Sequence, residues 1–192
     1  LDYKLREELR EQLPELFSGR GTVVVYATSE PEEALLLGGK TALMHDGRVT
    51  QFGITADIYR NPVNLTSAEV FSDPPINTAM IEKRGGHAVM QGGVKWKLIG
   101  AAQGLADGSY RIGIRPSDVL PSKNKQADVK IVGSIKVTEL SGSQSSAHFN
   151  FADQNWVSLA HGVHPFGIGD DHAFYMDASK CFFFSPDGQL VA

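Results

Sequence analysis

The residues with the clearest chemical potential stand together in the stretch VYATSEPEEA at positions 25–34. A polar turn that contains Ser29 separates a strand-like apolar run from the start of a helix rich in carboxylates. Serine is favoured just before a helix, because its hydroxyl can accept a hydrogen bond from the first turn. A helix N-terminus also favours anionic groups such as phosphate. The stretch therefore predicts a helix cap at Ser29, at a place that would suit a phosphate.

Histidine and cysteine give little support to a metal site. Among six histidines, His161 and His164 have the spacing of a possible ligand pair, but Pro165 follows at once and no third ligand is near in sequence. The single cysteine, Cys181, excludes an internal disulfide framework and any multi-cysteine zinc site. Its apolar neighbours, Phe182–Phe184, favour a small buried thiol. We expect no bound metal.

Composition and charge narrow the class of protein. The 192 residues are 42% hydrophobic, which is enough for a real core, and carry a formal charge of −4. Such a balance does not favour nucleic-acid binding, which usually shows a basic stripe. No apolar stretch approaches the roughly 20 residues that span a bilayer. The chain opens on a charged segment without an initiating Met, so we expect a fragment of a longer protein.

The elements around Ser29 predict a small α/β unit. Leucines at helical spacing indicate an amphipathic helix over residues 1–17, and the β-branched run at 22–27 favours a buried strand. Pro31 suits the first position of a helix that Gly38-Gly39 would end. Asp46-Gly47 predicts a tight hairpin turn between 41–45 and 48–52, and Thr55 a cap for a short helix.

The character of the sequence changes near residues 72–75, Ser-Asp-Pro-Pro. Beyond them, short β-like segments alternate with Gly, Asp, Ser and Asn, which is typical of a small barrel or sandwich. The expected strands lie near 78–84, 87–90, 95–99, 110–115, 128–139, 146–151, 156–160, 172–177 and 181–184.

Besides the stretch at 25–34, seven motifs follow one another along the chain: Leu1-Asp2, HDGRVTQFG at 45–53, DIYRNP at 57–62, TSAEVFSDPPIN at 66–77, GIRPSD at 113–118, PFGIGD at 165–170 and FSPDG at 184–188. Their order resembles that in the ATP-binding subunits of ATP-binding cassette (ABC) importers, of the maltose or carbohydrate-uptake and possibly glycerol type. In that family, the stretch at 25–34 resembles the segment that carries the switch histidine.

The resemblance implies an α+β chain of two parts. Residues 1–72 would be the C-terminal remnant of an α/β P-loop nucleotide-binding domain, and residues 73–192 an all-β OB-like regulatory domain, called TOBE. The implied function is ATP hydrolysis coupled to uptake of a sugar, polyol or similar solute. The implied cofactors are ATP and Mg²⁺ in the intact parent. The implied partners are a second, identical or different, ATP-binding subunit and membrane-spanning permease subunits, which would hold the protein at the cytoplasmic face of the plasma membrane.

Site residues follow from the same motifs. Ser29 stands where the family has its switch histidine, and it is shorter and cannot carry a positive charge. Asp2 resembles the D-loop aspartate that reaches across the subunit interface. In GIRPSD, the motif residues are Arg115, Pro116 and Asp118. Arg115 is either an ordinary strand arginine or a brace for the regulatory domain or its partner interface.

Whether the chain is an enzyme stays open. No GxxxxGK(S/T) loop occurs in the 192 residues, so we expect the fragment to bind no ATP and to be inactive, serving dimerisation or regulation. The alternative is a stand-alone OB-like module that senses a small solute or an oxyanion. Nucleic-acid binding by such a barrel needs exposed aromatics beside basic residues, and the aromatic run Phe182–Phe184 is apolar in context.

Overall fold

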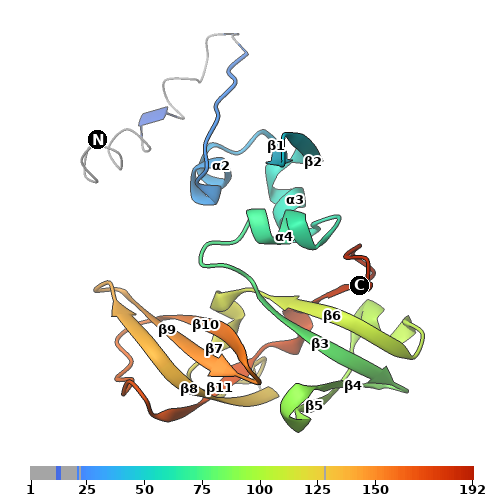
Figure 1. Ribbon diagram of the computed structural model, residues 1–192. Coiled ribbons are helices and arrows are strands. Elements are labelled where there is room, and N and C mark those ends of the chain that lie inside the picture. The colour runs from blue at the N-terminus through green and yellow to red at the C-terminus, as the bar shows by residue number, and fades with distance from the viewer. Residues whose placement is uncertain (1–11, 14–20, 22, 128) are drawn as a thin grey trace. The chain divides into compact units, whose positions relative to one another are not determined.

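The chain forms two compact units, residues 1–63 and residues 64–192 (Figure 1). The computed structural model describes residues 12–13, 21, 23–127 and 129–192. Asp2 and nearly all of the helix expected over residues 1–17 lie outside the described residues.

From residue 23 onward, the first unit contains two short helices and a hairpin. Its elements are α2 (Pro31–Leu37), β1 (Lys40–His45), β2 (Arg48–Ile54) and α3 (Thr55–Arg60). Pro31 opens α2, where its missing N–H costs nothing, and Gly38 ends it at φ 66° with its N–H bonded to the Ala34 carbonyl. Both helix signals are confirmed.

The hairpin turn is also confirmed. Strands β1 and β2 are antiparallel, and His45 pairs with Arg48 across the two-residue loop. Asp46 and Gly47 have φ values of 47° and 72°. Two positive φ angles match the right-handed twist of the flanking strands, and Asp-Gly adopts them at little cost.

Two local expectations for this unit are wrong. The run at 22–27 is not a buried strand: residues 23–28 are exposed and belong to no strand, because no described strand lies beside them to take their backbone hydrogen bonds. Thr55 is the first residue of α3 rather than its cap, since its hydroxyl donates instead to the Gly38 carbonyl at 3.0 Å. The Thr55 contact ties α3 back to the end of α2.

The second unit consists mainly of two five-stranded antiparallel sheets. One sheet has the order β12-β6-β3-β4-β5 and the other β10-β9-β8-β11-β7. The bounds are α4 (Leu65–Val70), β3 (Asn77–Arg84), β4 (His87–Met90), β5 (Lys95–Lys97), β6 (Gly108–Ile114), β7 (Val119–Leu120), β8 (Val129–Leu140), β9 (Gln144–Phe151), β10 (Gln154–His161), β11 (Asp171–Met176) and β12 (Phe182–Phe184), with 3₁₀ turns at Gln91–Gly93, Gly100–Gly104, Pro116–Asp118 and Ala178–Lys180.

The second of these sheets nearly closes on itself. Its two outermost strands, β10 and β7, meet where the buried Ser158 hydroxyl donates to the Val119 carbonyl at 2.6 Å. Closure removes exposed sheet edges, and a five-stranded, partly open barrel is the general form of an OB fold. The mainly β architecture expected for this region is therefore confirmed, and the closure is consistent with an OB-like barrel.

One buried side chain joins the two sheets. Asn77, at the start of β3, donates from Nδ2 to the Val157 carbonyl at 2.8 Å and accepts from the Val157 N–H at 2.6 Å. The amide thus replaces a neighbouring strand for Val157 on β10. Because Asn77 is only 2% exposed, water cannot take its place.

A continuous apolar core fills the space between the sheets. It includes Trp96 and Ile112 from the first sheet and Phe149, Trp156 and Phe174 from the second. The rings of Phe149 and Phe174 stack with their centroids 4.0 Å apart.

Helix α4 groups with this second unit. The Leu65 N–H donates to the Gly188 carbonyl at 2.8 Å, and Ala68 packs with Ile76 and Phe184. The boundary between the compact units therefore falls between residues 63 and 64 of the sequence. The division of the sequence at residues 72 and 73, and the remnant of a nucleotide-binding domain before it, stay predictions.

Candidate functional site

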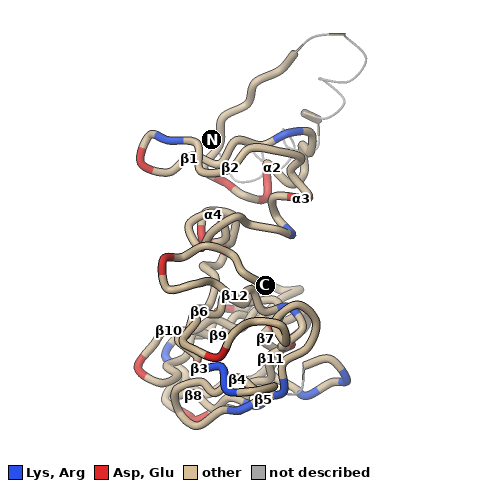
Figure 2. Tube along the Cα trace, turned by 90° about the vertical axis from the view of Figure 1, so that its right-hand side faces the viewer, with Lys and Arg blue, Asp and Glu red and all other residues tan. Residues whose placement is uncertain are grey.

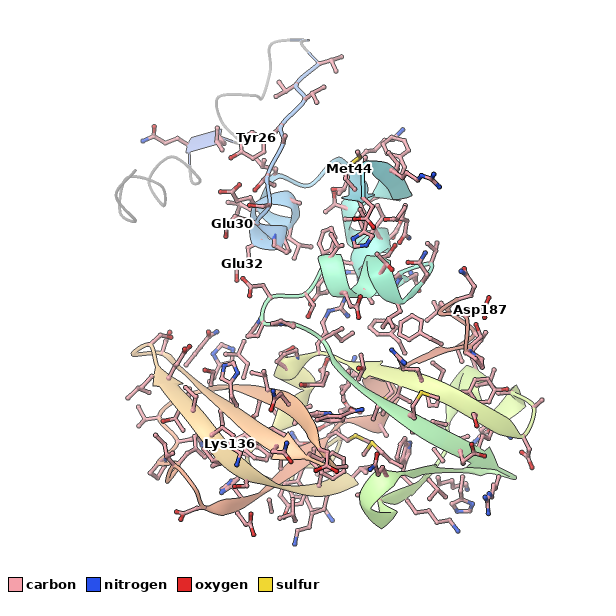
Figure 3. All side chains as sticks on the ribbon, in the orientation of Figure 1. Tyr26, Glu30, Glu32, Met44, Lys136 and Asp187 are labelled. Atoms are coloured by element: carbon pink, nitrogen blue, oxygen red, sulfur yellow. The ribbon has the colours of Figure 1, made fainter. Side chains whose placement is uncertain are left out.

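The stretch at 25–34 is organised around the start of α2. The Tyr26 hydroxyl donates to Glu33 Oε2 at 3.1 Å, and Glu33 is buried. Figure 3 shows Tyr26, Glu30 and Glu32 at this end of the unit. The carboxylates favour the helix start, whose free N–H groups carry partial positive charge.

Ser29 does not cap α2, contrary to expectation. The residue before the helix is Glu30, which makes no side-chain cap, and Ser29 is exposed in the preceding bend. The local hydroxyl contact comes from Thr28 instead, whose Oγ1 accepts from the Glu30 N–H at 2.9 Å. Threonine bonded to the backbone two residues on forms a small turn, and this turn carries the chain into Pro31.

That this chain alone holds no ATP or Mg²⁺ stays a prediction, and two observations bear on it. No phosphate-binding loop occurs in the sequence. Among the residues that the structure describes, no three histidine, cysteine or acidic side chains gather closely enough to hold a metal ion. His164 Nε2 lies 3.0 Å from the His161 carbonyl oxygen, so this pair contacts backbone.

The GIRPSD residues lie together in the second unit. Arg115 precedes the 3₁₀ turn Pro116–Asp118, which closes where the Asp118 N–H donates to the Arg115 carbonyl at 3.0 Å. Arg115 is 9% exposed, and its guanidinium carbon lies 5.0 Å from the ring centre of Phe182. A cation over an aromatic face is attracted to it, so this contact links the turn to β12.

Asp118 completes a small charged cluster. Burial raises the pKa of its carboxyl, and the nearby Asp177 raises it further, whereas Lys180 and Arg115 act in the opposite direction. The Asp177 N–H donates to the Asp118 carbonyl at 3.0 Å. Thus the motif joins the β6–β7 turn to the β11–β12 turn.

Cys181 sits beside the same cluster. Burial, and then the negative charges of Asp118 and Asp177, raise the pKa of the thiol above its usual range. A thiol held neutral is a poor nucleophile and a poor metal ligand. The side chain is half-buried, however, and not fully buried as expected from the sequence.

The sequence analysis did not predict two features of the structure. One is the Asn77 clamp, whose partner lies 80 residues away in the chain. The other is Lys83, a buried ammonium 2.9 Å from Asp107 Oδ1. Hydrogen bonds from the Gly85 N–H and then from Lys83 lower the pKa of the Asp107 carboxyl. The sequence offered one signal for this pair: Lys83 stands at a position where the alternation along β3 points a side chain into the core.

An open depression of about 400 Å³ lies beside α4. Its lining is largely polar and comes from α4, β6 and the segment after β12. Lining residues are Asn64, Leu65, Thr66, Arg111, Ser185, Pro186, Asp187, Gly188 and Gln189. Asp187 is labelled in Figure 3. Its shallow, open form gives no enclosed binding site, and none of the predicted site residues lines it.

The chain is similar in sequence to import ATP-binding proteins. It is 29% identical over 168 residues to the sn-glycerol-3-phosphate import ATP-binding protein UgpC of Shigella boydii, covering 86% of this chain and 47% of that protein. The UgpC of Escherichia coli K12 matches to the same extent. The xylose/arabinose import ATP-binding protein XacK of Haloferax volcanii is 30% identical over 155 residues, covering 80% of this chain and 40% of that protein.

These relatives confirm the resemblance drawn from the motifs: the chain is related to ATP-binding subunits of ABC importers. It spans less than half the length of the relatives it matches. No protein-family model matches the chain.

Among solved structures, the cytoplasmic molybdate-binding protein ModG with molybdate bound aligns with a TM-score of 0.43 and 16% identity. The alignment covers 57% of this chain and 96% of that chain. Such a likeness is too low to indicate a common fold or ligand.

None of the described helices is long and apolar enough to cross a membrane.

Proposed function

We propose that this chain acts as part of the ATP-binding subunit of an ABC importer, which couples ATP hydrolysis to the uptake of a sugar, polyol or similar solute. The observation that carries the proposal is the match to import ATP-binding proteins over 86% of the chain. That match includes both units, so it does not rest on the β-rich part alone. ATP and Mg²⁺ would be held by the complete subunit, together with a second, identical or different, ATP-binding subunit.

In this role Ser29 occupies the place of the switch histidine. Its exposed position in the bend before α2 leaves the hydroxyl accessible. Serine is shorter than histidine and stays uncharged, so the nucleotide site it serves would hydrolyse ATP slowly. Asp2 would reach across the interface between the two ATP-binding subunits, with permease subunits holding the pair at the cytoplasmic face of the membrane.

The second unit would serve dimerisation or regulation. The contacts of Arg115 with Phe182, and of Asp118 with Asp177, support a bracing role for the GIRPSD residues inside this unit. Pro116 fixes the turn between them, since its ring sets φ near the value that the turn needs. The alternative, a stand-alone solute or oxyanion sensor, is not favoured, because the relatives are import ATP-binding proteins.

A chimera tests the proposal directly. The segment of Escherichia coli UgpC that matches this chain is replaced by the chain, and the hybrid is produced in cells that lack their own UgpC. ATP hydrolysis by the purified hybrid and uptake of labelled glycerol 3-phosphate are measured. We expect slow hydrolysis with Ser29 and about tenfold or greater gain with Ser29→His, since a positioned catalytic group contributes on the order of 10²–10⁴ in rate.

The control is the same hybrid with the phosphate-loop lysine of UgpC replaced, which must be inactive. A folded Ser29→His hybrid that neither hydrolyses ATP nor supports uptake contradicts the proposal. Equal hydrolysis by the unmodified hybrid and the Ser29→His hybrid leaves the transport role intact and contradicts only the slow-site assignment.

A further inference from the structure

A row of basic side chains crosses three neighbouring strands of the first sheet. Arg84 on β3 pairs directly with His87 on β4, and His87 pairs directly with Lys97 on β5. Directly opposed residues of antiparallel strands project to the same face. All three side chains are exposed, and we call them the basic row. Figure 2 shows blue Lys and Arg positions near the labels of β3, β4 and β5, and on these strands they belong to β3 and β5.

Acidic side chains compensate the basic row only in part. On strands β3, β4 and β5 the only acidic residue is Glu82, which is exposed on the same face two residues before Arg84 and accepts a hydrogen bond from Ser109. Among the described residues, no ion pair involves Arg84 or Lys97, whereas the buried Lys83 is paired with Asp107. In a chain of net charge −4, this local excess of positive charge calls for an external partner.

The edge beside the row is open. Strand β5 pairs with β4 on one side, and no described strand pairs with its other side. Along β5 the side chains alternate: Trp96 is buried in the core, while Lys95 and Lys97 are exposed on the face of the basic row. An extended segment that adds to β5 would therefore place every second side chain beside these lysines.

Protection of the edge does not account for this pattern. Lysines on an edge strand discourage unwanted pairing between sheets. The basic row, however, continues inward to Arg84, which lies two strands from the edge, where such protection serves no purpose.

We propose that the β5 edge and the basic row bind an extended acidic segment of a partner protein, with carboxylates at alternate positions. The segment adds to β5 through backbone hydrogen bonds, and its carboxylates pair with Lys95, Lys97 and the rest of the row. Single-stranded nucleic acid is the poorer match, because the aromatic residue of β5, Trp96, is buried and cannot stack on a base. This binding is independent of the transport role proposed above.

The test uses the full chain and a fluorescein-labelled peptide of four Glu-Thr repeats, with fluorescence anisotropy as the readout. We expect saturable binding that weakens with salt, and no binding of the matched Gln-Thr peptide. Arg84→Gln with Lys97→Gln should weaken binding about tenfold, from the loss of two exposed charge pairs. The control is the double variant Lys130→Gln with Lys136→Gln, which makes the same charge change on β8. Its affinity for the peptide should stay within about twofold of the wild-type affinity.

A second pair of probes tests the geometry. The Glu-Thr peptide with N-methyl groups on alternate residues cannot donate hydrogen bonds along one edge, and it should bind about tenfold more weakly if it adds to β5. Oligothymidylate of equal charge should bind more weakly than the peptide. The proposal is overturned by no peptide binding, by equal affinity of both double variants, by equal affinity of the N-methylated peptide, or by tighter binding of the oligonucleotide. Circular dichroism confirms that each variant is folded.

Discussion

The two units of the chain differ in how many large apolar side chains they bury. In the first, Val25 is 92% and Phe52 is 65% exposed, and the hairpin also leaves Met44 exposed (Figure 3). In the second, Phe149 and Trp156 are fully buried between two sheets. A sheet needs a second layer to cover its apolar face, and among the described residues only those of the second unit form two such layers. Similar apolar runs in sequence thus produce a complete core in one region and an uncovered surface in the other.

The largest expected effect separates two phenylalanines. Phe149→Ala should destabilise the second unit by about 3–5 kcal/mol, because a fully buried ring leaves a cavity. Phe52→Ala should change stability by no more than about 0.5 kcal/mol, since its ring is mostly in solvent. Urea unfolding followed by tryptophan fluorescence, which reports the second unit, and by far-UV circular dichroism measures both. Equal losses for the two variants would break the comparison.

The next effect concerns the clamp between the sheets. Asn77→Ala removes both partners of the Val157 backbone and should cost about 2–4 kcal/mol, since each buried unsatisfied group costs about 1–3 kcal/mol. Asn155→Ala is the matched control: Asn155 is exposed on β10, the strand of Val157, and its loss should be nearly neutral for stability. A loss of stability in Asn77→Ala as small as that in the control would mean that the packing of the two sheets does not depend on this amide.

Close packing inside the barrel gives a third test. A methyl group on Gly133 would meet the Phe149 ring and lie 2.6 Å from the Asn150 carbonyl oxygen, so Gly133→Ala should cost about 1–3 kcal/mol. Gly104 has open space around its Cα, and Gly104→Ala should have little effect. The melting temperatures of the two variants provide the comparison. Tolerance of Gly133→Ala would show a looser core than the structure describes.

The smallest effect depends on pH and has opposite signs at two aspartates. The folded-state pKa of Asp118 is raised, so its contribution is present at low pH and is lost as pH rises through that pKa. At pH values above that pKa, the Asp118→Asn variant should therefore gain free energy of unfolding relative to wild type, by about 0.5 kcal/mol after solvent screening. The pKa of Asp107 is lowered, so its contribution is lost as pH falls, and Asp107→Asn should be less stable at neutral pH and equal to wild type in acid.

Urea midpoints between about pH 3 and pH 7 distinguish the two aspartates, because this range spans the ordinary pKa of a carboxyl. Parallel pH profiles for both variants would show that these carboxyls do not contribute as their surroundings indicate. They would also sharpen the view that the second unit is held mainly by its apolar core.

Alternating strands were largely predictable from the sequence. Each of the nine segments expected after residue 77 overlaps a strand of the structure, because period-two burial repeats along both sheets. Strand β7, with two residues, is too short to leave a pattern. The prediction of a buried strand at 22–27 was wrong, because β-branched residues indicate a preference for strands but do not supply the neighbouring strand that a sheet requires.

The candidate site was predictable only in part. The motif at 113–118 singles out Arg115 and Asp118, but their contacts with Phe182 and Asp177 depend on folding that brings distant segments together. The sequence predicted that the Ser29 hydroxyl caps α2, whereas the hydroxyl that accepts a backbone hydrogen bond before the helix is that of Thr28. Both hydroxyls precede Pro31, so the local sequence does not distinguish them. The role of Ser29 in hydrolysis stays a prediction.

The contrast between the two units is tested most directly by hydrogen exchange of the full chain, followed by mass spectrometry. Amides of β8, β9 and β11 should exchange slowly, with free energies of opening that approach the global value, because they lie in the two-layered unit. Amides of residues 23–28 and of the outer edges of β1 and β2 should exchange within seconds to minutes. Equal protection of the hairpin and the barrel would contradict the account, since it would mean that the first unit also has a complete core.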